Sequence, residues 1–295
     1  MIQTTIRVMS QKRLRLAIQS SGRLSEGSLD LLLRVGIRFN LSRKKLYSSS
    51  TNFPVDLYFL RDDDIPRYVG DGVADLGIVG ENIVAEQSAP VLIAAQLGFG
   101  KCRLSVAVRR EDPYDGPQSL NGKHIATSYP NLLNGFLEEQ GVDATVHSIS
   151  GSVEIAPGIG LADAVCDLVS TGSTLLSNGL REVETIMRSE AVLVTRPDLP
   201  EALKALTEQL LFRIAAVREA ANHKYILLNV PNNRVNDVSK VLPGMKSPTV
   251  VPLEREGWSS LHSVVKEDEF WDVIDRLQTA GAEGILVVPI EKMIR

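Results

Sequence analysis

Apolar positions along the chain follow two spacings, short strand-length runs and longer runs with helical periodicity. Up to residue 222 the short runs predict strands at 15–18, 55–60, 123–127, 144–149 and 191–195. The helical spacing predicts helices at 24–35, from about 66, at 132–140 and at 199–222. Strands that alternate with helices in this way indicate an α/β fold.

The order of elements changes after residue 223. The pattern there predicts strands at 225–230, 249–253, 259–265 and 285–289, with helices at 235–242 and 267–280. This is βαββαβ, the ferredoxin-like order. Its loops at 244–249 and 280–284 lack a nucleophile, a general base or a metal-ligand cluster. We therefore expect residues 223–295 to form a unit that regulates or assembles and does not catalyse.

A short internal repeat divides the part before residue 223. The sequence from Gly72 to Leu76 recurs in similar form from Gly160 to Ala164, and each copy leads along an apolar run to a glycine and a helix. The repeat predicts two similar α/β lobes that share a cleft, as in periplasmic binding proteins. We place the first lobe at 1–105, completed by about 190–222, and the second at 106–189.

Composition excludes several classes of protein. With 295 residues and 44% hydrophobic content, the chain is long enough for two or three domains. A net charge of −4 gives no electrostatic reason to bind nucleic acid or an acidic membrane. Cys102 and Cys166 lie in apolar runs and are expected to be reduced, which indicates a cytoplasmic protein. The first twelve residues predict a loose arm without a signal peptide.

The stretch from Glu154 to Leu175 combines two kinds of site chemistry. Three carboxylates, Glu154, Asp163 and Asp167, lie on or beside an apolar run that ends in the hydroxyl-rich loop 170–174, and 175–180 is predicted as a helical turn. Such a loop at a helix start suits a phosphate, and carboxylates suit ribose hydroxyls or a metal-bound phosphate. The hydroxyl-rich loop and the carboxylates together predict a phosphoribosyl ligand. An N-cap role for the hydroxyls is the alternative.

Two common nucleotide motifs are excluded in this stretch. No lysine follows Gly172, as a Walker loop requires, and Asp163 stands where a dinucleotide fingerprint needs its third glycine. Elsewhere, Arg23 and Arg61 follow predicted strands and are candidates for phosphate contacts. The acids 62–64 beside Arg61 are interpreted as a solvated helix cap. His124 and His147 lie within predicted strands and are interpreted as structural or exposed residues, not catalytic ones.

The letters EIAPGIGLADAVCDLVSTGSTL from Glu154 to Leu175 resemble the phosphoribosyl-pyrophosphate loop of the ATP phosphoribosyltransferase family. The resemblance extends through nearly the whole chain from about Leu14, and beyond residue 225 it is to the long form of the family. The further stretches that carry it are 19–24, 61–65, 75–82, 178–182 and 247–249.

The resemblance implies transfer of the 5-phosphoribosyl group of phosphoribosyl pyrophosphate to N1 of ATP, the first step of histidine biosynthesis. It implies Mg²⁺, held mainly by substrate phosphates. The implied catalytic residues are Glu154, Asp167 and Arg23. Implied contacts to phosphoribosyl pyrophosphate are Glu154, Asp163, Asp167, Ser170, Thr171, Gly172, Ser173, Thr174 and Leu175. Implied contacts to ATP or pyrophosphate are Gly22, Arg23, Arg61, Glu81 and Arg103. Many relatives carry lysine where Ser20 or Ser21 stands here.

The long form also implies regulation. In the long form the tail binds histidine. This binding inhibits the enzyme and accompanies a shift from dimers to hexamers. The residues implied for histidine are Asn229, Met245, Ser247, Thr249 and Gly284. Two alternatives from other classes stay open at this point: a solute-binding protein with the same two-lobed cleft, and a catalytically inert regulatory paralogue.

Overall fold

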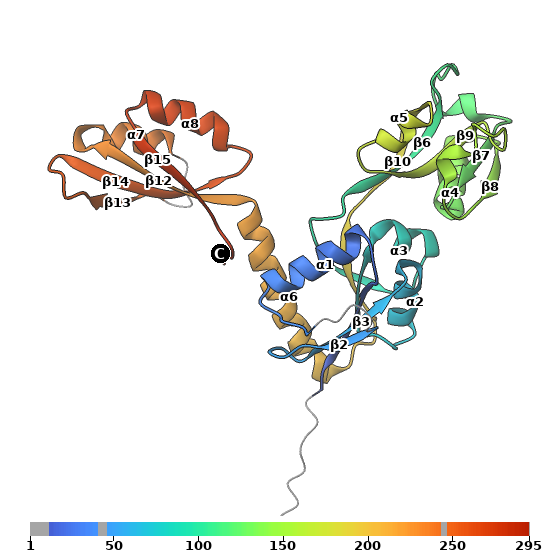
Figure 1. Cartoon of the computed structure of the whole chain (residues 1–295), viewed down its shortest axis with the longest axis horizontal. Helices are drawn as coiled ribbons and strands as arrows, with labels where there is room; N and C mark the ends of the chain where they lie inside the picture. Colours follow the sequence, from blue (N-terminus) through green and yellow to red (C-terminus); the bar gives the residue numbers. More distant parts are fainter. Residues whose placement is uncertain (1–11, 41–45, 243–246, 295) are drawn as a thin grey trace, which may run out of the picture. The chain divides into compact units, whose positions relative to one another are not determined.

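The computed structural model describes residues 12–40, 46–242 and 247–294 (Figure 1). The chain divides into two compact units, 1–208 and 209–295, and the division falls inside helix α6 (Glu201–Ala221). Within the described ranges, no helix has the length and apolarity that a membrane span requires. The predicted N-terminal arm lies outside them up to residue 11.

The first unit begins with a six-stranded sheet of order β2-β3-β1-β4-β11-β5, which we call the sheet of lobe I. Its strands are β1 (Leu14–Gln19), β2 (Tyr47–Ser49), β3 (Val55–Leu60), β4 (Leu76–Gly80), β5 (Leu92–Gln96) and β11 (Ala191–Thr195). Its helices are α1 (Arg23–Arg34), α2 (Ile65–Gly70) and α3 (Glu81–Gln87). Because β1 is parallel to both β3 and β4, three strands end at one edge.

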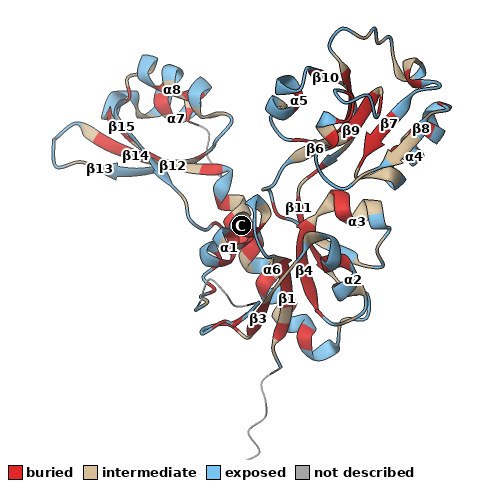
Figure 2. Ribbon diagram, turned by 45° about the vertical axis from the view of Figure 1, so that its right-hand side comes forward, coloured by how far each residue is buried: buried red, intermediate tan, exposed pale blue. Residues whose placement is uncertain are grey.

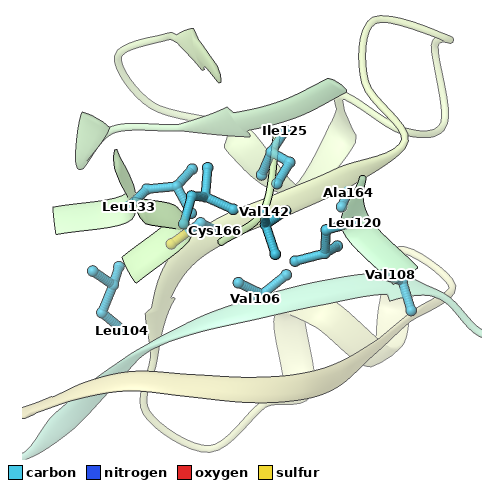
Figure 3. Close-up of a cluster of buried hydrophobic side chains, with 10 residues drawn as sticks. Leu104, Val106, Val108, Leu120, Ile125, Leu133, Val142, Ala164 and Cys166 are labelled. Carbon is cyan, nitrogen blue, oxygen red and sulfur yellow. The ribbon is translucent and has the colours of Figure 1, made fainter. Parts of the chain in front are cut away.

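A five-stranded sheet of order β10-β6-β9-β7-β8 forms lobe II. Its strands are β6 (Cys102–Arg109), β7 (His124–Thr127), β8 (Thr145–Ser148), β9 (Ala164–Val169) and β10 (Leu180–Ser189). Helix α4 (Pro130–Gln140) covers one face, where Leu104, Ile125, Leu133 and Cys166 pack together (Figure 3). On the other face, Val165 and Val169 pack with residues of the 3₁₀ turn η3 (Val153–Ile155).

Two paired segments join the lobes. The chain leaves lobe I after β5 and enters lobe II at β6, and it returns between β10 and β11. Leu97 N–H donates to Ala191 O at 2.9 Å, and Ala191 N–H donates to Phe99 O at 2.9 Å. With this double crossing, the first unit has the two-lobed, periplasmic-binding-protein-like α/β architecture that the sequence predicts.

The structure corrects one element beside the candidate site. The predicted helical turn at 175–180 is a shorter helix, α5 (Ser173–Ser177), and Leu180 already belongs to β10. This ten-residue strand was not predicted, and neither were β2, β5 and β6. Two register shifts in the pairing of β10 with β6 break the alternation by which a strand is recognised in a sequence.

The second unit carries the predicted ferredoxin-like domain. After β12 (His223–Pro231) the order is α7 (Val235–Val241), β13 (Thr249–Pro252), β14 (Trp258–Lys266), α8 (Phe270–Thr279) and β15 (Glu283–Pro289). The antiparallel sheet has the order β13-β14-β12-β15. Both helices cover one face, over a core that includes Ile226, Leu261 and Leu277, and much of β13 and β15 is exposed (Figure 2).

Candidate active site

The hydroxyl-rich loop 170–174 continues directly from β9. Ser170, Thr171, Ser173 and Thr174 are exposed, and Thr171 Oγ1 lies 3.0 Å from Ser173 Oγ. Gly172 has φ of 82°, a left-handed conformation that favours glycine and turns the strand into α5. The loop therefore exposes four hydroxyl groups, which are suitable partners for phosphate oxygens.

Two of the three predicted carboxylates come together beside this loop. Asp167 lies near the end of β9, and its Oδ1 accepts a hydrogen bond of 2.8 Å from Leu168 N–H. Burial raises the pKa of Asp167, the Leu168 hydrogen bond opposes this shift, and the charge of Glu154 in η3 adds to it. The turn η3 packs on β9 through Val153, so Glu154 lies close enough to Asp167 for its charge to act there, and we call these two carboxylates the acidic pair.

The third carboxylate, Asp163, lies at the other end of β9. Its Oδ2 accepts a hydrogen bond of 2.9 Å from His124 N–H, and its own N–H donates to His124 O. A strand rises about 3.3 Å per residue, so roughly 20 Å separate Asp163 from Ser170. Asp75, its counterpart in the internal repeat, ties Arg15 of β1 by the same pair of hydrogen bonds. The repeat therefore marks a register clamp between parallel strands, and the structure does not bring Asp163 to the loop.

Four of the five predicted ATP or pyrophosphate contacts belong to lobe I. Gly22, Arg23, Arg61 and Glu81 follow β1, β3 and β4, at the edge where these parallel strands end. Arg23 and Arg61 are exposed, and within the described ranges their side chains make no hydrogen bond or ion pair. Two unpaired guanidinium groups at a carboxyl edge can bind polyphosphate oxygens.

Arg103 lies on β6, in the sheet of lobe II, although the predicted boundary at residue 105 assigned it to lobe I, and its side chain has protein partners. It lies opposite Val169 in the sheet, its Nη1 donates to Ser170 O at 3.3 Å, and its guanidinium pairs with Glu182 of β10. The structure thus places Arg103 against the loop backbone, apart from the free arginines of lobe I.

A polar network that sequence reasoning missed connects the two lobes. Asn82 Nδ2 donates to Tyr129 Oη at 3.2 Å, and Ser189 Oγ donates to Asn82 Oδ1 at 2.9 Å. Burial, with a smaller contribution from the charge of Asp167, raises the pKa of Tyr129 far above its usual value, so its hydroxyl stays neutral. Asn82 falls within a stretch that carries the family resemblance, but no local pattern reveals its partners.

A cavity of about 500 Å³ lies beside this network. Lobe I contributes Asp62, Asp63 and Glu86, and lobe II contributes Ser128 and Tyr129 together with residues 148–151. Asp62 and Asp63, which precede helix α2, therefore also line a cavity. A polar cavity of this size has room for a nucleotide-sized ligand.

Comparison with known proteins decides the family. The family model described as ATP phosphoribosyltransferase matches residues 61–216, and the one described as HisG, C-terminal domain, matches 220–292. The ATP phosphoribosyltransferase of Cytophaga hutchinsonii is 57% identical over 282 residues, which is 96% of this chain and 99% of that protein. The chain belongs to the ATP phosphoribosyltransferase family. The C-terminal match indicates the long form of this family.

Solved structures agree with the fold. The ATP phosphoribosyl transferase (HisG:HisZ) complex from Thermotoga maritima contains a chain that is 27% identical, with a TM-score of 0.59, covering 68% of this chain and 98% of its own. The protein XAC2383 from Xanthomonas citri, bound to chloride, is 16% identical with a TM-score of 0.50 over 72% of this chain and 85% of its own. The second likeness concerns the fold alone.

In the C-terminal domain typical of the long-form ATP phosphoribosyltransferases, the structure places four of the five predicted histidine contacts. Asn229 in β12 neighbours Gly284, since a Cβ added to Gly284 would lie 3.3 Å from Asn229 Nδ2. Ser247 and Thr249 are exposed at the start of β13, separated from β12 by β14. Met245 lies outside the described residues.

No group of three or more histidine, cysteine, aspartate or glutamate side chains in the described part of the chain is arranged to hold a metal ion. The acidic pair Asp167 and Glu154 offers hard oxygen ligands of the kind that Mg²⁺ prefers. Since Mg²⁺ in ATP-dependent enzymes is commonly bound by one or two carboxylates and by substrate phosphates, this pair fits a shared site. The ATP phosphoribosyltransferase family uses a nucleotide whose phosphates could supply the remaining ligands.

Proposed function

We propose that this protein transfers the 5-phosphoribosyl group of phosphoribosyl pyrophosphate to N1 of ATP and releases pyrophosphate, the first step of histidine biosynthesis. The observation that carries the proposal is the order of groups at the end of β9: Asp167, whose pKa responds to the charge of Glu154 in η3, comes three residues before a loop with four exposed hydroxyls. A ligand with a phosphate and a ribose separated by one carbon matches this order of groups.

The reaction exchanges one bond for another. The N1 lone pair of adenine forms a bond to C1 of the ribose, and the bond from C1 to the pyrophosphate oxygen breaks with its electron pair on the pyrophosphate. N1 carries no proton, so the attack needs no general base. Positive charge that develops on the ribose is stabilised by Asp167 and Glu154, which also accept hydrogen bonds from its hydroxyls.

The remaining groups hold the substrates in place. The hydroxyls of the loop 170–174 bind the 5-phosphate, and the unpaired Arg23 and Arg61 bind the ATP phosphates or the departing pyrophosphate. Lobe II therefore holds the phosphoribosyl donor and lobe I the nucleotide. Binding both substrates across one cleft orients N1 towards C1, which removes much of the entropic barrier.

Mg²⁺ would be held by Asp167 or Glu154 together with substrate phosphates, and it would neutralise charge on the leaving pyrophosphate. Four substrate charges on ATP and a similar number on the donor make a divalent partner necessary beside an acidic pair. We therefore expect turnover to require Mg²⁺ in the assay.

The C-terminal domain is proposed to bind histidine and to inhibit the enzyme, with a change from dimers to hexamers. Asn229 and Gly284 are neighbours on the paired strands β12 and β15, and we place the ligand beside them. Val251, Leu286 and Val288 are exposed on the same sheet, and exposed apolar patches of this kind commonly mark protein–protein contacts. Inhibition and association should then change together, because histidine favours one arrangement of subunits.

The test is direct. Purified protein is mixed with ATP, phosphoribosyl pyrophosphate and Mg²⁺, and the product is identified by mass spectrometry together with released pyrophosphate. We expect equal amounts of N1-phosphoribosyl-ATP and pyrophosphate, and no turnover in excess chelator. Absence of product, or turnover that excess chelator leaves unchanged, would contradict the proposal.

A further inference from the structure

Strand β10 carries two glutamates that point to opposite faces of lobe II. Glu182 pairs with Ala107 on β6, but Glu184 pairs with the adjacent Val106, because a β-bulge at Val183 adds one residue to β10. In a regular strand, residues two apart share a face. The bulge separates them, and such bulges commonly redirect a side chain next to a functional site.

The two carboxylates have different partners as a result. Glu184 accepts a hydrogen bond of 3.0 Å from Tyr114 Oη, on the side of α4 and its core. Glu182 lies on the face that carries the hydroxyl loop, where both of its oxygens accept hydrogen bonds from the Arg103 guanidinium and Oε1 also accepts one of 2.7 Å from Ser105 Oγ. Ser105 is buried and lies opposite Asp167 in the sheet.

Arg103 connects this carboxylate to the loop. While Nε and Nη2 bind Glu182, Nη1 donates to the carbonyl of Ser170, the residue at which β9 becomes the loop. An arginine held at two of its nitrogens by a carboxylate has a fixed plane, so the third nitrogen fixes the position of its acceptor. Glu182, Arg103 and Ser170 form one chain of contacts from β10 to the loop.

We propose that Glu182 is a positioning residue of the phosphate-binding loop, acting through Arg103, and that Arg103 anchors the loop and does not bind the polyphosphate. The proposal rests on the proposed function and deepens it. Its geometry is independent of any ligand, because each contact in the chain joins groups of the protein.

The charges around the pair agree with this assignment. The Arg103 guanidinium holds the pKa of Glu182 below its usual range, so the pair stays ionised at neutral pH. Arg188 lies opposite Arg103 in the sheet, is exposed, and makes no hydrogen bond or ion pair in the described part of the chain. A polyphosphate at this edge would meet Arg188 as the free cation, since Arg103 is neutralised by Glu182.

The experiment compares Glu182→Gln with Glu184→Gln, a matched control two residues away on the same strand. Calorimetry measures the affinity of each variant for phosphoribosyl pyrophosphate, for pyrophosphate and for ATP. We expect Glu182→Gln to weaken binding of phosphoribosyl pyrophosphate about tenfold or more, as for a lost charge-assisted contact. Its ATP affinity should stay unchanged, Glu184→Gln should bind like the wild type, and Glu182→Asp should restore part of the loss.

If Arg103 binds polyphosphate directly, freeing it in Glu182→Gln will leave pyrophosphate and phosphoribosyl pyrophosphate affinity unchanged or raise it, and the proposal is overturned. A general loss of folding would lower all three affinities, and this outcome also counts against a specific role in positioning.

A second measurement needs no substrate and separates this proposal from the proposed function. Amide hydrogen exchange of residues 170–174 is followed in the ligand-free variants. Faster exchange in Glu182→Gln than in Glu184→Gln supports positioning even if the wild type fails to bind phosphoribosyl pyrophosphate. Equal exchange in the two variants would refute it.

Discussion

Glu86 and Asn131 cap each other's helices across the two lobes. The Glu86 carboxylate accepts hydrogen bonds of 2.8 and 2.9 Å from the N–H groups of Asn131 and Leu132, at the start of α4. Asn131 Nδ2 donates in return to the Glu86 carbonyl, near the end of α3, at 2.9 Å. Because the residue before α4 provides no capping side chain, lobe I supplies the cap for a helix of lobe II.

We predict that Glu86→Ala lowers the free energy of unfolding by about 1 kcal/mol, the usual cost of a lost N-cap. Loss of the contact should also loosen the association of the lobes and raise KM for the substrates. Chemical denaturation and steady-state kinetics measure the two effects. Glu139→Ala, at an exposed position in the last turn of α4, is the control and should change neither the free energy of unfolding nor KM. A stability equal to wild type in Glu86→Ala would contradict the cap.

Asp167→Asn should stabilise the fold and remove function. Burial raises the pKa of Asp167 above that in the unfolded chain, so its ionisation costs folding free energy as pH rises through the folded pKa. The variant should have a higher Tm than wild type at pH 7 to 8, with a difference that shrinks towards pH 4. Its affinity for phosphoribosyl pyrophosphate should fall on the order of ten- to a hundredfold. Calorimetric scans and titrations across pH test both parts.

The wild type should show the matching pH dependence of binding. Protonation removes the charge of Asp167 and weakens it as an acceptor for the ribose hydroxyls, so wild-type affinity for phosphoribosyl pyrophosphate should weaken as pH falls through the raised pKa, and this part of the pH dependence should be missing in Asp167→Asn. Identical pH profiles for the wild type and the variant would place Asp167 outside the binding site.

Asp163→Ala should affect the stability of the fold, and Thr171→Val should affect substrate affinity. Asp163 clamps β9 to β7, so its loss should lower the free energy of unfolding by about 1 kcal/mol and leave substrate affinity intact. Thr171 exposes its hydroxyl on the loop, so its replacement should weaken binding of phosphoribosyl pyrophosphate and leave stability unchanged. Chemical denaturation measures the free energy of unfolding of both variants, and calorimetry measures their affinity for phosphoribosyl pyrophosphate. Loss of affinity in Asp163→Ala at full stability would return Asp163 to the site.

Histidine should inhibit the full-length enzyme and increase its assembly state in the same concentration range. Asn229→Ala should weaken both responses. Thr279→Val, at the end of α8, is the control. Activity assays and analytical ultracentrifugation with millimolar histidine measure the responses. A full-length enzyme that ignores histidine, or a Thr279→Val variant that loses the response, would contradict the assigned position.

Local patterns predicted the elements that are regular. The strands 55–60 and 191–195 and the βαββαβ order of the tail are confirmed, because their apolar residues keep an unbroken period and end at clear turns. Strand β10 was missed because its two register shifts interrupt the alternation on which recognition depends. The loop 170–174 was predictable, since its hydroxyls and glycine are consecutive in the sequence.

Local patterns do not predict contacts between residues that are far apart in the sequence. The sequence presents Asp163 and Asp167 as similar acids four residues apart, and only the neighbouring strand β7 shows that Asp163 is used within the fold. Arg103 and Glu182 are far apart in the sequence, and so are Glu86 and Asn131. Contacts of this kind depend on the topology of the sheets, which no local period encodes.

The position of β11 between β4 and β5 has a consequence for the order in which the protein folds. Lobe II is one continuous stretch of chain, so its sheet can form as soon as β10 has left the ribosome. Lobe I must wait, because β5 has no neighbour in its sheet until β11 has been synthesised about a hundred residues later. During that interval β4 and β5 expose unpaired edges, and we expect the nascent chain to be most prone to aggregation there.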